Sequence, residues 1–409
     1  MSIRRDKLYR FPWSRTDNPG GWIEVTDECD LACPACYRFS LRGHVPIEEI
    51  KSDILQLKHR VNCDCIAIAG GEPLLYPDLV EAVEFITKNE LKSRILTNGQ
   101  RLTWDLAQDL KKAGLTAISF HVDSQQSRPG WDGKTEVEMN ELRQHYADLI
   151  WELGGVHCGF LTTVYRSTLQ DIPDVLAWSR KNLHKVRSLA LIALRGAPLS
   201  EEIEYFASGT KVDPSHLRTS FANPDEINIS AEDLYGIIED RFPASHPSAY
   251  LNGTALPESY KVLIIPYLGS KHSVFGTVGA RTIEFTQTIY HLFKGRYNLG
   301  LRKMAAGRKI FLMSLVDPVI RKSFSKYLKA VIRNPLSLFS RIYIQTIQIQ
   351  QPNEIMNGES NLCDGCLNQM VYKDKIINSC RLDEYRMYGG PLIPLKSQVK
   401  MRDQSYQQK

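Results

Sequence analysis

The sequence predicts an α/β fold with a parallel sheet, because short β-rich runs alternate with helical runs from about residue 21 to 196. Repeated βα units of this length imply parallel strands with covering helices. An open partial barrel and a doubly wound sheet both fit this pattern, and in either fold ligands gather at the carboxyl ends of the strands. The expected strands are residues 22–26, 65–69, 93–96, 117–122, 156–164 and 188–194, and the expected helices are 46–59, 77–88, 103–113, 137–153 and 169–182.

The alternation weakens after Gly196. Residues 200–270 are rich in Pro, Ser, Asp and Glu, which predicts loops and short elements. Earlier in the chain, Thr103 lies one turn before an apolar helical run and is expected to cap that helix.

One segment is strongly basic. Residues 281–345 contain 13 Lys and Arg but only two acidic residues, a net charge of +11 in a chain whose total is +5. Within it, Asp317-Pro318 starts a predicted helix and Asn334-Pro335 ends it. One face of this helix is apolar and carries Ile320, Phe324, Tyr327, Leu328 and Val331.

Three interpretations of this basic amphipathic helix are open. It is a charged face over an ordinary core helix, a site that docks on an anionic membrane, or an RNA-binding element. In the membrane interpretation, Phe324, Tyr327 and Leu328 enter the headgroup boundary. The sequence shows no recognised RNA-binding motif, so we rank the membrane above RNA and do not expect nucleic acid as a partner.

The cysteines indicate metal binding. Residues 1–13 lack the apolar run of a secretory signal, and no stretch approaches about 18 apolar residues. We therefore expect the cytoplasm, with peripheral contact at the inner membrane surface. Nine cysteines, an odd number, argue against complete disulfide pairing in that reducing compartment.

Three of these cysteines follow the first expected strand. Cys29, Cys33 and Cys36, spaced by three and then two residues, let one loop hold three irons of a [4Fe–4S] cluster. The fourth iron then has no protein ligand and is open to a small molecule. Structural zinc or buried thiols are the alternative, although zinc usually requires four ligands.

The triplet resembles the signature of the radical S-adenosylmethionine (SAM) superfamily, and motifs at three further strand ends resemble it too. They are Gly70-Gly71-Glu72-Pro73, Leu96-Thr97-Asn98-Gly99 and the run from Ser119 to Ser124. The resemblance implies a partial (β/α)6 TIM-like barrel in which SAM chelates the open iron and is cleaved to a 5′-deoxyadenosyl radical. The SAM contacts that it implies are Tyr37, Gly70, Gly71, Glu72, Pro73, Thr97, Asn98, His121 and Asp123.

Two positions depart from that family's pattern. Ala35 precedes the third cysteine where an aromatic residue usually packs by the adenine, and Tyr37 is expected to compensate. His121 stands where relatives often have Ser.

A second cysteine set lies near the C-terminus. Cys363, Cys366 and Cys380 resemble in spacing the auxiliary [4Fe–4S] site of the GTP cyclase that starts molybdenum-cofactor synthesis. The fourth iron of such a cluster is open to substrate or to a fourth ligand such as Cys158. A zinc knuckle is the alternative to a second cluster. In that cyclase, the residues that follow the second cysteine are basic and contact GTP. Residues 367–370 here are Leu-Asn-Gln-Met, so we expect a substrate other than GTP.

The sequence thus predicts four parts: an N-terminal extension (1–20), a radical SAM core (21–200), a variable region (201–350) and a C-terminal auxiliary iron–sulfur region (351–409). The leading hypothesis is an enzyme that abstracts hydrogen from an unactivated C–H bond of a lipid or other apolar substrate. A peptide-modifying enzyme and a non-catalytic iron–sulfur or zinc protein are the alternatives. The resemblance implies a flavodoxin- or ferredoxin-like electron donor.

Overall fold

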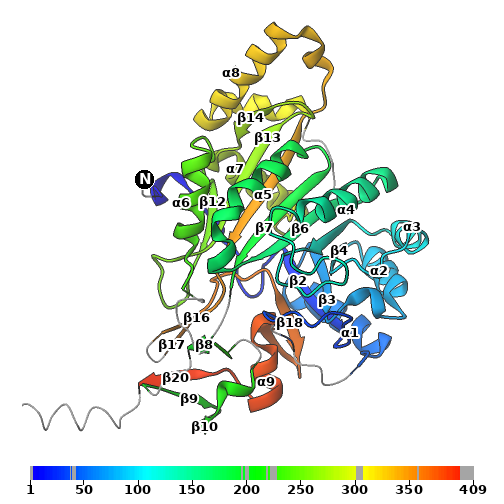
Figure 1. Cartoon of the computed structure of the whole chain (residues 1–409), viewed down its shortest axis with the longest axis vertical. Helices are drawn as coiled ribbons and strands as arrows, with labels where there is room; N and C mark the ends of the chain where they lie inside the picture. The colour runs from blue at the N-terminus through cyan, green and yellow to red at the C-terminus, as the bar shows by residue number, and fades with distance from the viewer. Residues whose placement is uncertain are drawn as a thin grey trace, which may run out of the picture.

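A computed structural model of the chain describes residues 3–36, 38, 43–194, 197–198, 202–217, 220–221, 228–300, 307–356 and 359–396. Its centre is one large sheet with helices packed along its outer side (Figure 1). Smaller two- and three-stranded sheets lie at the end of the molecule opposite helix α8 (Figure 1).

The six predicted parallel strands are confirmed, in the spatial order β7-β6-β5-β4-β3-β2. Five helices connect them, as predicted, and Thr103 caps α3 by accepting a hydrogen bond from the backbone N–H of Leu106. The strands are β2 (Gly20–Thr26), β3 (Cys65–Gly70), β4 (Lys92–Thr97), β5 (Ala117–His121), β6 (His157–Val164) and β7 (Val186–Ala193). The helices are α1 (Ile47–Arg60), α2 (Leu79–Lys88), α3 (Trp104–Lys112), α4 (Asn140–Leu153) and α5 (Ile172–Lys181).

The sheet continues beyond β7 with strands that come much later in the chain. β15 (Tyr343–Gln350) pairs with β7 in parallel, and β13 (Tyr260–Gly269) then pairs with β15 in antiparallel orientation. β12 (Ala249–Asn252) and β1 (Tyr9–Arg10) complete that edge, and β14 (Val274–Thr277) pairs with β13. The sheet therefore contains strands from both sides of residue 200, where the sequence predicts a domain boundary. The predicted division into domains stays a prediction.

The prediction of loops for residues 200–270 was wrong in two places. Helix α6 (Ala231–Arg241) and the ten-residue strand β13 both lie in this region. β13 is buried along nearly its whole length, so it lacks the alternation of a half-exposed strand. It also contains Pro266, a residue that usually argues against a central strand.

The connectivity requires a curved sheet. β1 and β2 lie at opposite ends of a path of ten strands, yet only residues 11–19 separate them in sequence. Ten flat strands at about 4.8 Å spacing would hold those edges about 43 Å apart, whereas the short connection reaches at most about 35 Å. The sheet therefore curls into the predicted partial barrel, with its opening crossed by residues 11–19.

The basic helix is confirmed as α8 (Pro318–Arg333), capped by Asp317, whose side chain accepts hydrogen bonds from the N–H groups of Val319 and Ile320. Ile320 and Tyr327 are buried in a small core with residues of β14 and of the 3₁₀ helix η6 (Arg308–Leu315). Helix α7 (Ala280–Lys294) precedes η6, and η7 (Pro335–Phe339) follows α8. No helix in the described ranges is long and apolar enough to cross a membrane.

The C-terminal part folds back beside the carboxyl ends of the parallel strands. It contains β16 (Glu354–Met356), β17 (Glu359–Asn361), β18 (Gln369–Tyr372), β19 (Lys375–Asn378), η8 (Ser379–Arg381), α9 (Leu382–Tyr388) and β20 (Ile393–Lys396). β20 joins β9 (Ile203–Ala207) and β10 (Thr210–Val212), and β8 (Ala197–Pro198) pairs with β11 (Ser220–Phe221).

Candidate functional site

A cavity of about 1310 Å³ lies inside the curved sheet. Inward-facing residues of the parallel strands line it, together with the loops at their carboxyl ends. Its lining also includes α7 and η6, which belong to the basic segment. One continuous space therefore joins the predicted cluster site to the region near α8.

The three N-terminal cysteines lie together at this cavity. Cys29, Cys33 and Cys36 all line it, and all three are free thiols. Burial, then the negative charges of Asp123, Cys36 and Cys29, raise the pKa of Cys33 to about 12. No group of three His, Cys, Asp or Glu side chains within the described residues converges on a single metal ion. A [4Fe–4S] cubane takes its thiolates at separate corners, whereas a structural zinc ion usually takes four ligands on one centre.

The predicted glycines hold the cysteine loop itself. The N–H of Gly71 donates to the carbonyl of Thr26 at 2.7 Å, and that of Glu72 donates to the carbonyl of Glu28 at 2.7 Å. A Cβ on Gly71 would lie 2.1 Å from the Glu28 oxygen, and one on Gly70 would lie 2.2 Å from the Thr26 oxygen. Both glycines are therefore required by a close approach between two backbone segments.

Glu72 connects the glycine loop to the end of β4. Its buried carboxylate accepts hydrogen bonds from the Leu74 N–H at 2.9 Å, the Thr97 hydroxyl at 2.5 Å and the Asn98 N–H at 2.6 Å. Burial raises its pKa to about 7. These three donors occupy the carboxylate, which favours a positioning role over direct SAM contact.

Asn98 extends this network back to the cysteine loop. Its side-chain amide donates to Asp30 at 2.7 Å, and Asp30 also pairs with Arg101 at 2.9 Å. Asp30 directly follows Cys29, so the end of β4 fixes the first cysteine of the triplet.

The end of β5 reaches the second cysteine. Nε2 of His121 lies 3.0 Å from the Thr163 hydroxyl and 3.2 Å from the Asp123 carboxylate. The thiol of Cys33 lies 3.8 Å from the carbonyl oxygen of Gln126 in the following loop. Thr97, Asn98, His121 and Asp123 all line the cavity, as the sequence led us to expect.

Of two further predicted SAM contacts, one lies away from the cavity and the other is not described. Pro73 is buried at the start of the 3₁₀ turn Pro73–Leu75 and is not part of the cavity lining. Tyr37 lies outside the described residues.

Sequence reasoning missed Arg128. Its buried guanidinium donates to the carbonyl oxygens of Asn98 and His121 and to the side chain of Gln126, at 2.8–3.1 Å. It thus joins the ends of β4 and β5. Its position in an irregular loop gave no periodic signal that could have identified it.

Two of the C-terminal cysteines contact each other. The thiols of Cys363 and Cys366 interact directly, and this contact and burial raise the pKa of Cys366. Of the three, Cys380 alone lines the cavity, next to Ser379. A second cluster at these residues remains a proposal.

The structure excludes Cys158 as the fourth ligand. Cys158 is buried in the main core, on the face of β6 opposite Leu161 and Thr163, which line the cavity.

Buried ion pairs hold the C-terminal part against the cluster loop. Arg38 pairs with Glu24 of β2 and lies 3.6 Å from Asp383 of α9, and it donates to the carbonyl of Ser379 at 2.9 Å. Arg386 of α9 pairs with Asp27 at 3.0 Å. Cys380 is therefore fixed relative to the first cysteine loop by charges on both sides.

The comparison with protein families is decisive for the core. Residues 23–178 match the Radical SAM superfamily. The chain carries a radical SAM domain. This domain is typical of enzymes that use a [4Fe–4S] cluster and SAM as cofactors.

Curated relatives share this radical SAM domain. GTP 3′,8-cyclase of Desulforamulus reducens is 35% identical over 108 residues, covering 25% of this chain and 33% of that protein. AdoMet-dependent heme synthase of Methanosarcina barkeri is 28% identical over 163 residues, covering 36% of this chain and 43% of the relative. The alignments thus span less than half the length of either relative.

Among solved structures, Streptococcus suis SuiB bound to S-adenosylmethionine aligns with a TM-score of 0.40 and 15% identity. The alignment covers 55% of this chain and 47% of SuiB.

Proposed function

We propose that the enzyme reductively cleaves SAM at a cluster held by Cys29, Cys33 and Cys36, and abstracts hydrogen from an unactivated C–H bond of a lipid or similar apolar substrate. The observation that carries this proposal is the cavity of about 1310 Å³, which has the three cysteines in its wall and mainly aliphatic and aromatic side chains beyond them. When bound, the cluster and SAM supply a 5′-deoxyadenosyl radical.

In this proposal the protein's own residues position the cysteine loop and SAM, and they shield the reacting carbon from water. Gly70 and Gly71 hold the cysteine loop against β3, while Glu72, Asn98 and Arg128 lock the neighbouring strand ends. Thr97, Asn98, His121 and Asp123 present polar groups to SAM at the same edge of the sheet. Because the site lies inside the curved sheet, water is kept from the reacting carbon.

The residues at the end of the cavity away from the cysteines support an apolar substrate. There the lining includes Leu312 and Leu315 of η6, whose side chains are 70% and 79% exposed. The following elements, α8 and η7, carry Ile332, Leu336 and Phe339, which are 73–80% exposed. We call these five residues the exposed apolar surface. Large apolar side chains at such exposure are typical of a site that meets a membrane or a partner.

We propose that this surface contacts an anionic membrane, since it belongs to the segment of net charge +11. The membrane contact predicted from the sequence named other residues. Tyr327 is buried, and the partly buried Phe324 packs against Phe311 and Tyr327. Only Leu328 of that set is exposed. A flavodoxin- or ferredoxin-like donor is proposed to supply the electron.

The first test is release of 5′-deoxyadenosine by the anaerobically reconstituted, reduced enzyme, with lipid or aqueous extract of the source cells added separately. We expect stimulation by the lipid fraction and no release by Cys33→Ala. The matched control is Cys63→Ala, because Cys63 is buried away from the cavity and its variant should retain turnover. Stimulation by the aqueous fraction alone would contradict a lipid substrate, and unchanged turnover in Cys33→Ala would contradict the cluster assignment.

A further inference from the structure

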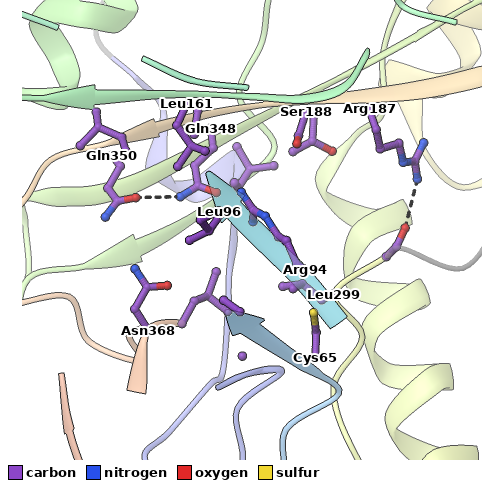
Figure 2. A pocket seen from close by; sticks show the side chains of 18 of the residues that line it. Cys65, Arg94, Leu96, Leu161, Arg187, Ser188, Leu299, Gln348, Gln350 and Asn368 are labelled. Atoms are coloured by element: carbon purple, nitrogen blue, oxygen red, sulfur yellow. Dashed lines mark hydrogen bonds between the residues drawn. The ribbon is translucent and has the colours of Figure 1, made fainter. Parts of the chain in front are cut away.

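Two arginines of the parallel strands line the cavity. Arg94 lies on β4 and Arg187 on β7, and Figure 2 shows both among the lining residues. Arg94 lies three residues before Thr97, which is about 10 Å along the strand at about 3.3 Å per residue. These arginines are therefore separate from the strand ends where SAM is expected.

Arg94 is short of acceptors. Its Nε donates to the Ser119 hydroxyl at 2.9 Å, and within the part of the chain that is described no acceptor meets its two terminal NH₂ groups. A guanidinium carries five N–H donors in a planar fork, so four of them are left for a ligand in the cavity.

Arg187 adds a second fixed positive charge. Its guanidinium donates to the carbonyl oxygens of Ile344 and Gly300, both neutral acceptors. Burial lowers the pKa of Arg187 to about 10 and also lowers the pKa of Arg94, because each charge is held away from water.

The other charges of the cavity wall do not neutralise this pair. Arg38 and Lys92 each have a buried carboxylate partner, Glu24 and Asp64 respectively. The acidic residues of the lining are Glu72 and Asp123, at the carboxyl ends of the strands. Across the described ranges no carboxylate forms an ion pair with Arg94 or Arg187.

A buried charge without a counter-charge is costly, and proteins retain one where a ligand supplies the opposite charge. We propose that Arg94, supported by Arg187, binds an anionic group of the substrate, a carboxylate or a phosphate. This inference rests on the proposed function, because it assumes that an apolar substrate occupies the cavity. The substrate is then an anionic amphiphile whose apolar chain extends along the aliphatic wall.

The polar neighbours of Arg94 support this assignment. Gln348 and Gln350 of β15 both face the cavity, and the amide of Gln348 donates to Gln350 at 3.1 Å (Figure 2). Ser188 and Asn368 also line the cavity (Figure 2). Such neutral groups can donate further hydrogen bonds to an anion without adding negative charge.

The test is calorimetric binding to the oxidised, reconstituted enzyme without reductant, using decanoate, decyl phosphate and decanol below their micelle concentrations. We expect at least one anion to bind about tenfold or more tightly than decanol, as expected for charge-assisted hydrogen bonds. A preference between the two anions identifies the group as carboxylate or phosphate.

Arg94→Gln should lower the affinity for the preferred anion by about tenfold or more and leave that for decanol unchanged. Arg94→Lys keeps the positive charge, so its affinity for the preferred anion should fall less than that of Arg94→Gln. The matched control is Arg241→Gln, an exposed arginine at the end of α6, with no expected effect. Arg187→Gln gives the same comparison if the Arg94 variant does not fold.

Equal affinity of the wild type for anions and decanol, or equal losses in the Arg94 and Arg241 variants, overturns the inference. Because no turnover is needed, this outcome is distinguishable from failure of the proposed reaction. An enzyme that releases 5′-deoxyadenosine but shows no anion preference refutes the anion site alone. One that binds the anions through Arg94 but never cleaves SAM refutes the reaction alone.

Discussion

At the scale of single residues, Glu72 predicts a specific dependence of stability on pH. Burial raises its pKa to about 7 in the folded protein, above the ordinary value of 4.5 for a glutamate. Between these two values the unfolded chain loses the proton while the folded chain keeps it, so folding is weakened as pH rises from 4.5 to 7. Glu72→Gln should flatten this part of the stability curve, measured by urea unfolding over that range; an unchanged slope contradicts the assignment.

Gly71 provides a second test at this scale. Gly71→Ala places a Cβ 2.1 Å from the Glu28 carbonyl oxygen, so the cysteine loop must move. We expect a loss of about 1–3 kcal/mol in stability and reduced iron content after reconstitution. Gly236→Ala is the control: that site in α6 has nothing within 4 Å, and alanine there should stabilise by about 0.5–1 kcal/mol. Similar iron content in both variants would argue against a role for Gly71.

Several motifs that follow predicted strands lie at the cavity, while the SAM contacts predicted for them stay a prediction. The positions of Thr97, Asn98, His121 and Asp123 at one edge follow from parallel strands alone. Arg94 was not identified because one arginine in a strand looks like an exposed charge. Only the curvature of the sheet, which depends on distant strands, turns it inward.

At the scale of elements, the basic helix was predicted with the correct start and end, but its apolar face turned out to be internal. Periodicity shows that a helix has an apolar face without showing what covers it. Here β14 and η6 cover it, and the exposed apolar residues lie on η6, at the end of α8 and on η7.

Because the exposed apolar residues lie outside the covered face of α8, membrane binding should depend on them. Leu336→Glu with Phe339→Glu should reduce sedimentation with vesicles containing phosphatidylserine by about tenfold, since apolar contact is lost and negative charge is added. Trp104→Glu with Trp151→Glu is the control, because these residues are also exposed but lie on α3 and α4. Equal binding of the wild type to neutral and anionic vesicles would rule out electrostatic docking.

At the scale of the whole molecule, local patterns predicted the βα units but not the strands that complete the sheet. β13 and β15 acquire their partners across long separations in sequence. β13 is buried almost throughout and lacks the alternation of a half-exposed strand, whereas β15 alternates between buried and partly buried residues but was not predicted. The contact of the C-terminal part with the core depends on buried ion pairs that no spacing rule reveals.

Those ion pairs can be tested directly. Arg38→Met leaves the buried carboxylates of Glu24 and Asp383 without this partner, and we expect a loss of about 3–5 kcal/mol in stability. Chemical denaturation measures the effect, with Arg241→Met as an exposed control. A change below about 1 kcal/mol, the usual range for an exposed pair, would contradict a buried network.

The place of β1 in the sheet has a consequence for how the chain is made. Tyr9 and Arg10 pair with Ala249 and Tyr250, so β1 must wait for 240 further residues to be synthesised before its partner exists. At about 5–20 residues per second this delay is roughly 10–50 s. During this time the seam beside residues 11–19 stays open, and the barrel can close there only after β12 has been synthesised.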